Sequence, residues 1–378
     1  MARSAHAPLL LTPGPVSVSG TTKAVMLLDR ASGDEDFSAD LRFARAYLLE
    51  VVNATQAFTA IPVPGSATYA NEAAIALLVP PGRKLLIHSN GVYGDRLVEI
   101  CEALGIPATV LRTGPFAAPD VDAFRAALHA DAAISHVMLV HCETSTGMMN
   151  PLEEVAALCR ELGRGLLVDA VASFGANPID AKALGLDAVI LSSNKCMQGV
   201  PGCGWALIRT AALDAAGPGR RSLSLDLRDQ NQHMDTTGTF RFTPPTQVVA
   251  AFAQACREHA VEGGSPARLR RYEANWRRLV DGMRQMGFRT VVPDTSASPI
   301  VATFHNPDDP AFSFEALNKG MKARGFVIFP GRLALANTFR IGCMGAVTEQ
   351  DIGEAMAAVA EVMAEMGLTR FGHAPISA

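Results

Sequence analysis

The chain has 378 residues, of which 49% are hydrophobic and 19% are charged. This length and composition are typical of a globular enzyme with a large core and two domains. The formal net charge of −4 is spread along the chain without a basic stripe, and no apolar run reaches the length of a membrane span. We therefore expect neither nucleic acid nor a membrane among the partners.

Short apolar runs alternate with amphipathic stretches between about residues 55 and 210. The apolar runs predict strands at 84–88, 108–111, 137–140, 165–169, 188–191 and 204–208. The amphipathic stretches predict helices at about 69–79, 95–104, 120–129 and 152–163. Strands that are joined by crossover helices form a mostly parallel sheet with both faces covered, so we expect an α/β fold for this region.

The C-terminal third of the chain has a different organisation. A predicted helix near 245–262 ends at Gly263-Gly264-Ser265-Pro266, a sequence that stops a helix and turns the chain. Beyond it the pattern predicts helices and strands at 267–286, 300–304, 314–324, 327–329, 338–341 and 349–366. We expect a Pro-rich extended arm across the surface at 1–20, a large domain at 21–262 and a small α+β domain at 263–378.

The cysteines and histidines indicate the cellular compartment of the protein and whether it has a metal site. Seven cysteines, an odd number, occur without a C-x-x-C pair, which predicts free thiols in a reduced, cytoplasmic protein. The start of the chain also lacks the apolar region of a signal peptide. His136, His141, Cys142 and Glu143 lie close in sequence, but the two histidines flank an apolar strand. We interpret them as strand-end residues and expect no metal site.

Asp169 and Lys195 form the most informative pair in the chain. Asp169 ends one predicted strand and Lys195 follows the next, and ligands gather at the carboxyl ends of parallel strands. A loop residue or a solvated strand end would explain either residue alone, but their spacing brings both to one edge of the sheet. A lysine can hold pyridoxal phosphate (PLP) as a Schiff base, and an aspartate can hold a proton on its ring nitrogen. The pair therefore predicts a PLP enzyme.

Two other stretches suit such a cofactor. Small residues precede the helix predicted at 69–79, and its first amides, with the hydroxyls of Ser66 and Thr68, form a site suited to a phosphate ester. Ordinary helix capping would use the same residues. Tyr93 follows a predicted strand, where an aromatic side chain either lies against a flat ring or is a half-buried loop residue.

Arg340 lies between apolar residues on the strand predicted at 338–341. A guanidinium in such a place needs an anionic partner or an exposed end. Its planar shape suits the carboxylate or phosphonate of a substrate. An intramolecular salt bridge is the alternative.

Several motifs resemble those of the PLP-dependent class V aminotransferases. The most specific are Asp169-Ala170-Val171-Ala172-Ser173-Phe174-Gly175 and Ser193-Asn194-Lys195-Cys196-Met197-Gln198-Gly199. Others are Leu11-Thr12-Pro13-Gly14-Pro15, Glu143-Thr144-Ser145-Thr146-Gly147, Arg241-Phe242-Thr243-Pro244-Pro245-Thr246 and Gly325-Phe326-Val327-Ile328-Phe329-Pro330-Gly331. The resemblance implies the fold-type I PLP-transferase architecture, a large α/β domain with a mostly parallel central sheet and a smaller C-terminal α+β domain.

The resemblance also implies a role for each candidate residue. Lys195 would bind PLP and move protons, and Asp169 would pair with the ring nitrogen. The other implied cofactor contacts are Thr146 with the ring hydroxyl, Tyr93 and Val171 with the two ring faces, and Ser66, Ala67, Thr68 and Asn194 with the phosphate. Thr243 would complete the phosphate site of the neighbouring subunit in a homodimer with shared sites, and Arg340 would bind the acidic end of the substrates.

The motifs are most similar to those of family members that act on 2-aminoethylphosphonate and pyruvate, which implies phosphonoacetaldehyde and alanine as products. Residues 228–238 lack a tryptophan and a glutamate that those members carry, residues 28–37 lack an expected aromatic residue, and Ala67 stands where glycine is usual. One alternative is therefore a carboxylate donor, such as alanine or serine, with glyoxylate or pyruvate. The others are a PLP lyase acting on a related aminophosphonate and a non-catalytic binding protein, although the latter would not need both Lys195 and Asp169.

Overall fold

The structure is a computed structural model that describes residues 8–217, 221–330 and 337–368. The chain divides into two compact units. The large unit comprises Val18–Glu143 and Met149–Arg268, and the small unit comprises Met1–Ser17, Thr144–Met148 and Leu269–Ala378. This division falls within helix α10 (Gly264–Gln285), shortly after the boundary expected between 262 and 263, which stays a prediction.

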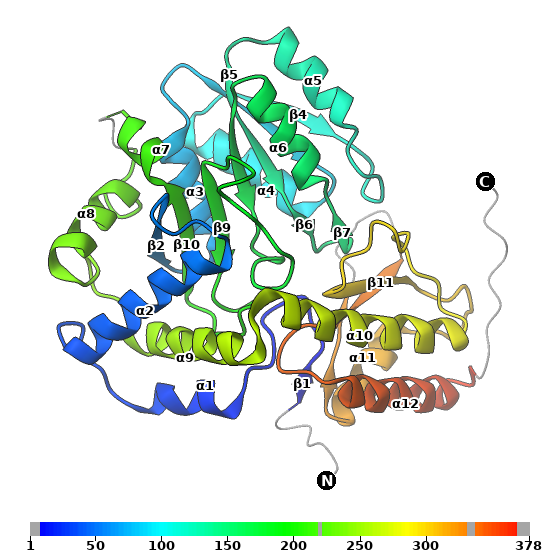
Figure 1. The fold of residues 1–378 in the computed structure, drawn as a ribbon. Helices are drawn as coiled ribbons and strands as arrows, with labels where there is room; N and C mark the ends of the chain where they lie inside the picture. The colour runs from blue at the N-terminus through cyan, green and yellow to red at the C-terminus, as the bar shows by residue number, and fades with distance from the viewer. Residues whose placement is uncertain (1–7, 218–220, 331–336, 369–378) are drawn as a thin grey trace. The chain divides into compact units, whose positions relative to one another are not determined.

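A seven-stranded sheet forms the centre of the large unit (Figure 1). Its order is β2-β10-β9-β8-β5-β3-β4, with β2 (Phe58–Pro64), β3 (Lys84–Ser89), β4 (Ala108–Arg112), β5 (Ile134–Val140), β8 (Gly165–Asp169), β9 (Ala188–Ser192) and β10 (Cys203–Arg209). β10 is antiparallel to both of its neighbours, and the other pairs are parallel. The expected mostly parallel sheet is therefore confirmed.

Helices connect these strands as expected. The crossover helices are α3 (Ala67–Leu78), α4 (Val92–Leu104), α5 (Val121–Ala130) and α6 (Leu152–Glu161), and each lies within a few residues of its predicted position. The other elements of the large unit are α1 (Gly20–Ala24), a 3-10 helix (Val25–Leu27), α2 (Glu35–Val51), the short strand β6 (Cys142–Glu143), α7 (Thr210–Ala215), α8 (Leu227–Thr237) and α9 (Thr246–Glu262). α9 ends at Gly263, whose φ of 106° is readily adopted only by glycine.

The sequence patterns did not predict β2 or α2. β2 contains Pro62 and Pro64, which lack an N–H donor and normally argue against a strand, but β2 is the edge strand of the sheet, where proline is tolerated. α2 buries Phe37, Leu41, Ala44 and Leu48, which recur at helical spacing, and it packs beside α9 (Figure 1).

The small unit is a compact α+β structure. An antiparallel sheet has the order β11 (Val301–His305), β14 (Thr338–Gly342) and β13 (Phe329–Pro330). Helices α11 (Phe314–Ala323) and α12 (Glu349–Glu365) pack against each other. The two-residue strand β7 (Met148–Met149) lies at the boundary between the two units in the chain, shortly before α6. The ring of Phe339 lies 5.5 Å from that of Phe288 and 5.7 Å from that of Phe304, between centroids, at the centre of this core.

The described part of the expected N-terminal arm is extended, but it does not run across the surface as expected. β1 (Leu9–Leu10) pairs in parallel with β12 (Phe326–Val327) in the small unit. Leu9 and Leu11 point to the same side of the extended chain and are buried in that unit's core. Residues 1–7, and Gly331 of the motif at 325–331, lie outside the described residues.

Candidate active site

Asp169 and Lys195 follow neighbouring strands of the central sheet. Strands β5, β8 and β9 are adjacent and parallel, so their carboxyl ends share one edge of the sheet. Asp169, the last residue of β8, is in register with Val140 of β5 and Ile190 of β9. Lys195 follows the end of β9 by three residues, at the same edge. The adjacency that the chain order predicted is therefore present in the fold.

Asp169 is buried and has two hydrogen-bond donors. The backbone N–H of Val171 donates to Oδ1 over 3.0 Å, and the amide of Asn71 on α3 donates to Oδ2 over 2.7 Å. Burial raises the pKa of Asp169, while these hydrogen bonds and the charges of Arg96 and Lys195 act in the opposite direction. Burial is the larger effect, so the pKa of Asp169 lies above its ordinary value, and the two donors and two cations partly offset it in favour of the ionised carboxylate, which is the form needed to hold a proton on a ring nitrogen.

The loop that carries Lys195 is held by backbone contacts on both sides. The N–H of Gln198 donates to the carbonyl oxygen of Lys195 over 2.9 Å, and the N–H of Gly199 donates to that of Ser193 over 2.7 Å. The thiol of Cys196 donates to the carbonyl oxygen of Ala172 over 3.0 Å, in the turn that follows Asp169. The lysine loop and the aspartate turn are therefore joined directly.

The start of α3 carries the residues that are expected to bind a phosphate. Ser66 is the N-cap residue, with extended backbone angles, yet its side chain makes no capping hydrogen bond to the helix. The backbone at this point lies against β10, because a Cβ atom at Gly204 would come within 3.0 Å of the Cα of Ala67. Free N–H groups at a helix start attract anions, and an uncommitted hydroxyl adds a donor, so this turn fits the phosphate of PLP.

Tyr93 lies in the first turn of α4, on the connection that follows β3. The N–H groups of Tyr93 and Gly94 donate to the buried carboxylate of Glu143, over 3.1 Å and 3.2 Å. The guanidinium of Arg96 lies 5.0 Å from the centre of the Tyr93 ring, and it donates to the hydroxyl of Thr68 over 3.5 Å. Arg96 therefore links the residue expected on the ring face with the start of α3.

Thr146 and Arg340 belong to the small unit. The carbonyl oxygen of Thr146 accepts a 2.7 Å hydrogen bond from Thr303 of β11. Arg340 is 1% exposed, and its guanidinium donates to the carbonyl oxygens of Thr144, over 2.6 Å, and Pro330, over 3.3 Å, and lies 5.1 Å from the centre of the Phe329 ring. A buried cation held in this way is suited to an anionic ligand, and its role with a substrate stays a prediction.

Thr243 and the start of α8 line a cavity of about 290 Å³ in the large unit. Thr243 is exposed, and the same cavity is lined by Tyr69 of α3, Asp226 and Phe242. Tyr69 and Phe242 are each 50% exposed, and Leu223 nearby in sequence is 62% exposed. Tyr69 and Phe242 therefore place exposed apolar surface around this cavity.

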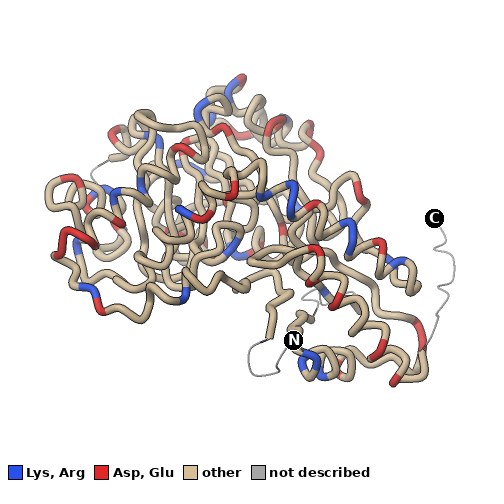
Figure 2. Tube along the Cα trace, turned by 60° about the horizontal axis from the view of Figure 1, so that its bottom comes forward, with Lys and Arg blue, Asp and Glu red and all other residues tan. Residues whose placement is uncertain are grey.

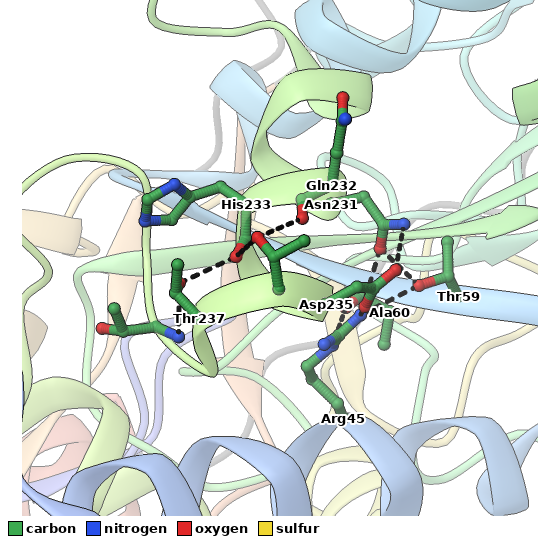
Figure 3. Close-up of polar contacts among 10 residues, drawn as sticks. Arg45, Thr59, Ala60, Asn231, Gln232, His233, Asp235 and Thr237 are labelled. Carbon is green, nitrogen blue, oxygen red and sulfur yellow. Dashed lines mark hydrogen bonds and ion pairs between the residues drawn. The ribbon is translucent and has the colours of Figure 1, made fainter.

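The two segments that depart from the pattern of the resembling proteins lie together. Residues 228–238 form most of α8, and the hydroxyl of Thr239 donates to the carbonyl oxygen of Ser32 over 2.9 Å. Arg45 of α2 holds the middle of this helix in place (Figure 3). It donates to Asn231 and Asp235 over 3.0 Å each, to Thr59 over 3.1 Å and to the carbonyl oxygen of Ala60 over 2.9 Å. The first segment is therefore joined to the residue that directly follows the second, and α8 is joined to α2 and β2.

Sequence inspection did not single out Asn71, Glu143 or Arg96 as functional residues. Asn71 and Asp169 are 98 positions apart, and Glu143 and Tyr93 are 50 apart. No local motif marks such contacts. The buried amide and carboxylate become recognisable only when the strands and helices are assembled.

Lys and Arg are interspersed with Asp and Glu along the described trace and do not gather in a stripe (Figure 2). All seven cysteines are buried and free. Within the described residues no His, Cys, Asp and Glu side chains cluster as a metal site would require, and none of the helices has the length and apolarity to span a membrane.

The fold is shared with proteins of known class. A model of the class-V aminotransferases matches residues 31–320. The chain is similar to alanine–glyoxylate aminotransferase from Nostoc sp., with 27% identity, a TM-score of 0.88 and coverage of 94% and 95% of the two chains. Pyridoxamine–pyruvate aminotransferase from Mesorhizobium loti has the same fold, with a TM-score of 0.86, 24% identity and coverage of 97% and 95%. The chain therefore belongs to the class-V aminotransferase family, and the expected fold is confirmed.

Two individual relatives with high sequence identity have the same name. The chain is 45% identical over 362 residues to 2-aminoethylphosphonate–pyruvate transaminase from Pseudomonas fluorescens, covering 95% of this chain and 97% of the relative. It is 44% identical over 369 residues to the Pseudomonas aeruginosa protein of that name, covering 97% and 99% of the two chains. The similarity therefore spans both units.

Proposed function

We propose that this chain is a PLP-dependent aminotransferase that moves the amino group of 2-aminoethylphosphonate to pyruvate, giving phosphonoacetaldehyde and alanine. The observation that carries the proposal is the 45% identity, over nearly the full length, to a relative named for this reaction. The buried carboxylate of Asp169 and the lysine loop at the neighbouring strand end support it, because amino transfer through PLP needs both groups.

The residues of the chain have distinct tasks in this reaction. When bound, PLP supplies a carbonyl group that condenses with amines and a ring that accepts electrons from the substrate carbon. The amine of Lys195 would hold the cofactor and, once released, would take the proton from that substrate carbon and deliver it to the cofactor carbon that came from the carbonyl group. Asp169 keeps a proton on the ring nitrogen, and Arg340 binds the acidic end of the substrate.

The remaining assignments concern how the cofactor is held. Tyr93 and Val171 contact the ring faces, and Thr146 binds the ring hydroxyl. The phosphate is held by Ser66, Ala67, Thr68 and Asn194. Arg96 adds a positive charge beside Thr68, which supports an anion at the start of α3.

We also propose a cytoplasmic homodimer in which Thr243 serves the phosphate site of the partner. The exposed side chains of Tyr69, Leu223 and Phe242 support an interface beside Thr243. The absence of disulfides among the buried cysteines supports a reducing compartment.

A carboxylate donor is the second candidate. It is favoured by the departures at 28–37 and 228–238, which a hydrogen bond from Thr239 to Ser32 brings near each other, and by the similarity to an alanine–glyoxylate aminotransferase. A guanidinium such as that of Arg340 binds a carboxylate as readily as a phosphonate, so this residue does not separate the candidates.

Half-reactions of the purified holoenzyme separate the two functions. 2-Aminoethylphosphonate, alanine or serine is added alone, and conversion of the bound cofactor to its amine form is followed by absorbance. We expect rapid conversion with 2-aminoethylphosphonate and formation of alanine when pyruvate is then added. Conversion only with alanine or serine would move the function to the carboxylate donor, and protein without bound PLP would contradict both.

A further inference from the structure

Asn71 is a buried amide whose hydrogen bond is directed at Asp169. It is 4% exposed, and its Nδ2 donates to Oδ2 of Asp169 over 2.7 Å. The other carboxylate oxygen accepts from the N–H of Val171 over 3.0 Å. Within the described residues the amide oxygen of Asn71 is buried without a hydrogen-bond partner. Burying an oxygen without a hydrogen-bond partner costs free energy. We infer that the hydrogen bond from the Asn71 amide to Asp169 is the reason for an asparagine at this position.

The position of Asn71 in the fold connects it with the expected phosphate site. Asn71 follows Thr68 by three residues on α3, so both side chains lie on one face of the helix. The start of this helix carries Ser66, Ala67 and Thr68, and one turn further on it presents the amide to Asp169. A single rigid helix therefore fixes the distance between the phosphate site and the donor to the aspartate.

We propose that Asn71 is a positioning residue for amino transfer, which fixes the orientation of the Asp169 carboxylate and stabilises its ionised form. The inference rests on the proposed PLP function. An amide donor stabilises a carboxylate more than a carboxylic acid. Without it, the proton shared between Asp169 and the ring nitrogen moves toward the carboxylate, and the unprotonated ring withdraws electrons less well.

The test uses PLP labelled with ¹⁵N at the ring nitrogen, bound to the wild-type protein and to Asn71→Leu. The ¹⁵N resonance reports ring protonation without any substrate. In wild type we expect the protonated position, and in Asn71→Leu a move toward the unprotonated one. The rate constant kcat for amino transfer should fall by about ten- to a hundredfold, the equivalent of losing a hydrogen bond to a charged group, with little change in KM.

Asn275→Leu is the matched control. Asn275 is also a fully buried amide, with Nδ2 donating to the carbonyl oxygens of Cys343 and Val347 and with Oδ1 lacking a partner among the described residues. Its loss should lower the thermal stability without moving the ¹⁵N resonance. Asn71→Ala, which keeps the helix and removes the amide, replaces Asn71→Leu if the larger side chain prevents folding.

The outcomes separate the inference from the function. A resonance that stays at the wild-type position in both Asn71 variants, or that moves equally in Asn275→Leu, overturns the role of Asn71 and leaves the function intact. A wild-type protein that does not bind PLP overturns the proposed function itself. A move confined to the Asn71 variants supports the inference.

Discussion

The guanidinium of Arg268 donates a hydrogen bond over 2.6 Å to the carbonyl oxygen of Cys196, the residue that follows Lys195. Arg268 is 2% exposed, and it also donates through Nε, over 2.9 Å, and Nη2, over 2.5 Å, to the carboxylate of Glu262 at the end of α9. An ion pair between a buried arginine and a partly exposed glutamate, at the end of one helix, thus holds the backbone of the loop that carries Lys195.

Replacing Arg268 should therefore disturb both stability and cofactor binding. Arg268→Met leaves the partly exposed Glu262 without its cation and the buried Cys196 carbonyl without this donor, and the loss of such hydrogen bonds should cost about 1.5–3 kcal/mol of unfolding free energy. Urea denaturation measures this loss, and dialysis against PLP-free buffer measures cofactor retention. Arg277→Met is the control, because Arg277 forms an exposed pair with Glu273, and it should cost less than about 0.5 kcal/mol. Equal losses in the two variants would contradict the prediction.

Lys195→Ala should bind PLP without the covalent link and should lose turnover. Activity should fall by roughly a thousandfold or more, because proton transfer by a positioned group alone contributes about 10²- to 10⁴-fold. The visible absorption spectrum of the bound cofactor and an assay for alanine measure the two effects. Lys182→Ala, at an exposed position, should leave both unchanged. Substantial turnover by Lys195→Ala would refute its assignment.

His141 should make stability depend on pH below neutrality. It is fully buried, it shares a 3.0 Å hydrogen bond with the hydroxyl of Ser173, and burial lowers its pKa from 6.5 to about 4. Below pH 6.5 the unfolded chain takes up a proton on this histidine while the folded protein does not, which lowers the free energy of unfolding. The stability that comes from keeping His141 neutral is therefore fully present above pH 6.5 and is lost as the pH falls toward 4. The loss amounts to about 3 kcal/mol for this one group.

The measurement compares the unfolding free energy at pH 7 and pH 4.5 for wild type and His141→Gln. The variant should lose less stability than wild type over this interval. His129→Gln removes an exposed histidine and should follow the wild-type curve. Parallel curves for wild type and His141→Gln would show that another group controls this pH range.

Gly94→Ala should destabilise the start of α4. A Cβ atom there would lie 2.6 Å from the Cα of Ser89, a backbone atom with little room to move, and overpacking of this kind costs about 1–3 kcal/mol. PLP affinity should also weaken, since Tyr93 precedes this residue. Gly114→Ala has no atom within 4 Å of the added carbon and serves as the control in thermal unfolding and PLP titration. Normal stability and affinity in Gly94→Ala would count against the close packing.

The proposed interface beside Thr243 is tested by adding a charge. Phe242→Asp places a carboxylate in the exposed apolar patch and should shift the protein from dimer to monomer, because a desolvated charge opposes association. Sedimentation velocity measures the change. Val261→Asp, at a side chain that is 89% exposed on α9, should leave the assembly unchanged. A dimer that persists in Phe242→Asp would locate the interface elsewhere.

Much of the fold was predictable because its signals are local. The apolar runs and helical spacing between residues 67 and 209 anticipated β3, β4, β5, β8, β9 and β10 and the helices between them. Glycine and proline marked the end of α9. Edge strand β2 was missed because its prolines contradict the usual strand composition, and only its place beside β10 makes them acceptable.

The sequence by itself determined the family and the placement of Asp169 and Lys195 at the ends of successive strands, because strand order follows from the alternation of patterns along the chain. Tertiary structure alone decided what surrounds them. Asn71 reaches Asp169 across 98 positions and Arg268 reaches Cys196 across 72. Such contacts depend on how helices pack on the sheet, and the residue types involved are common on any helix, so no local pattern distinguishes them before the chain has folded.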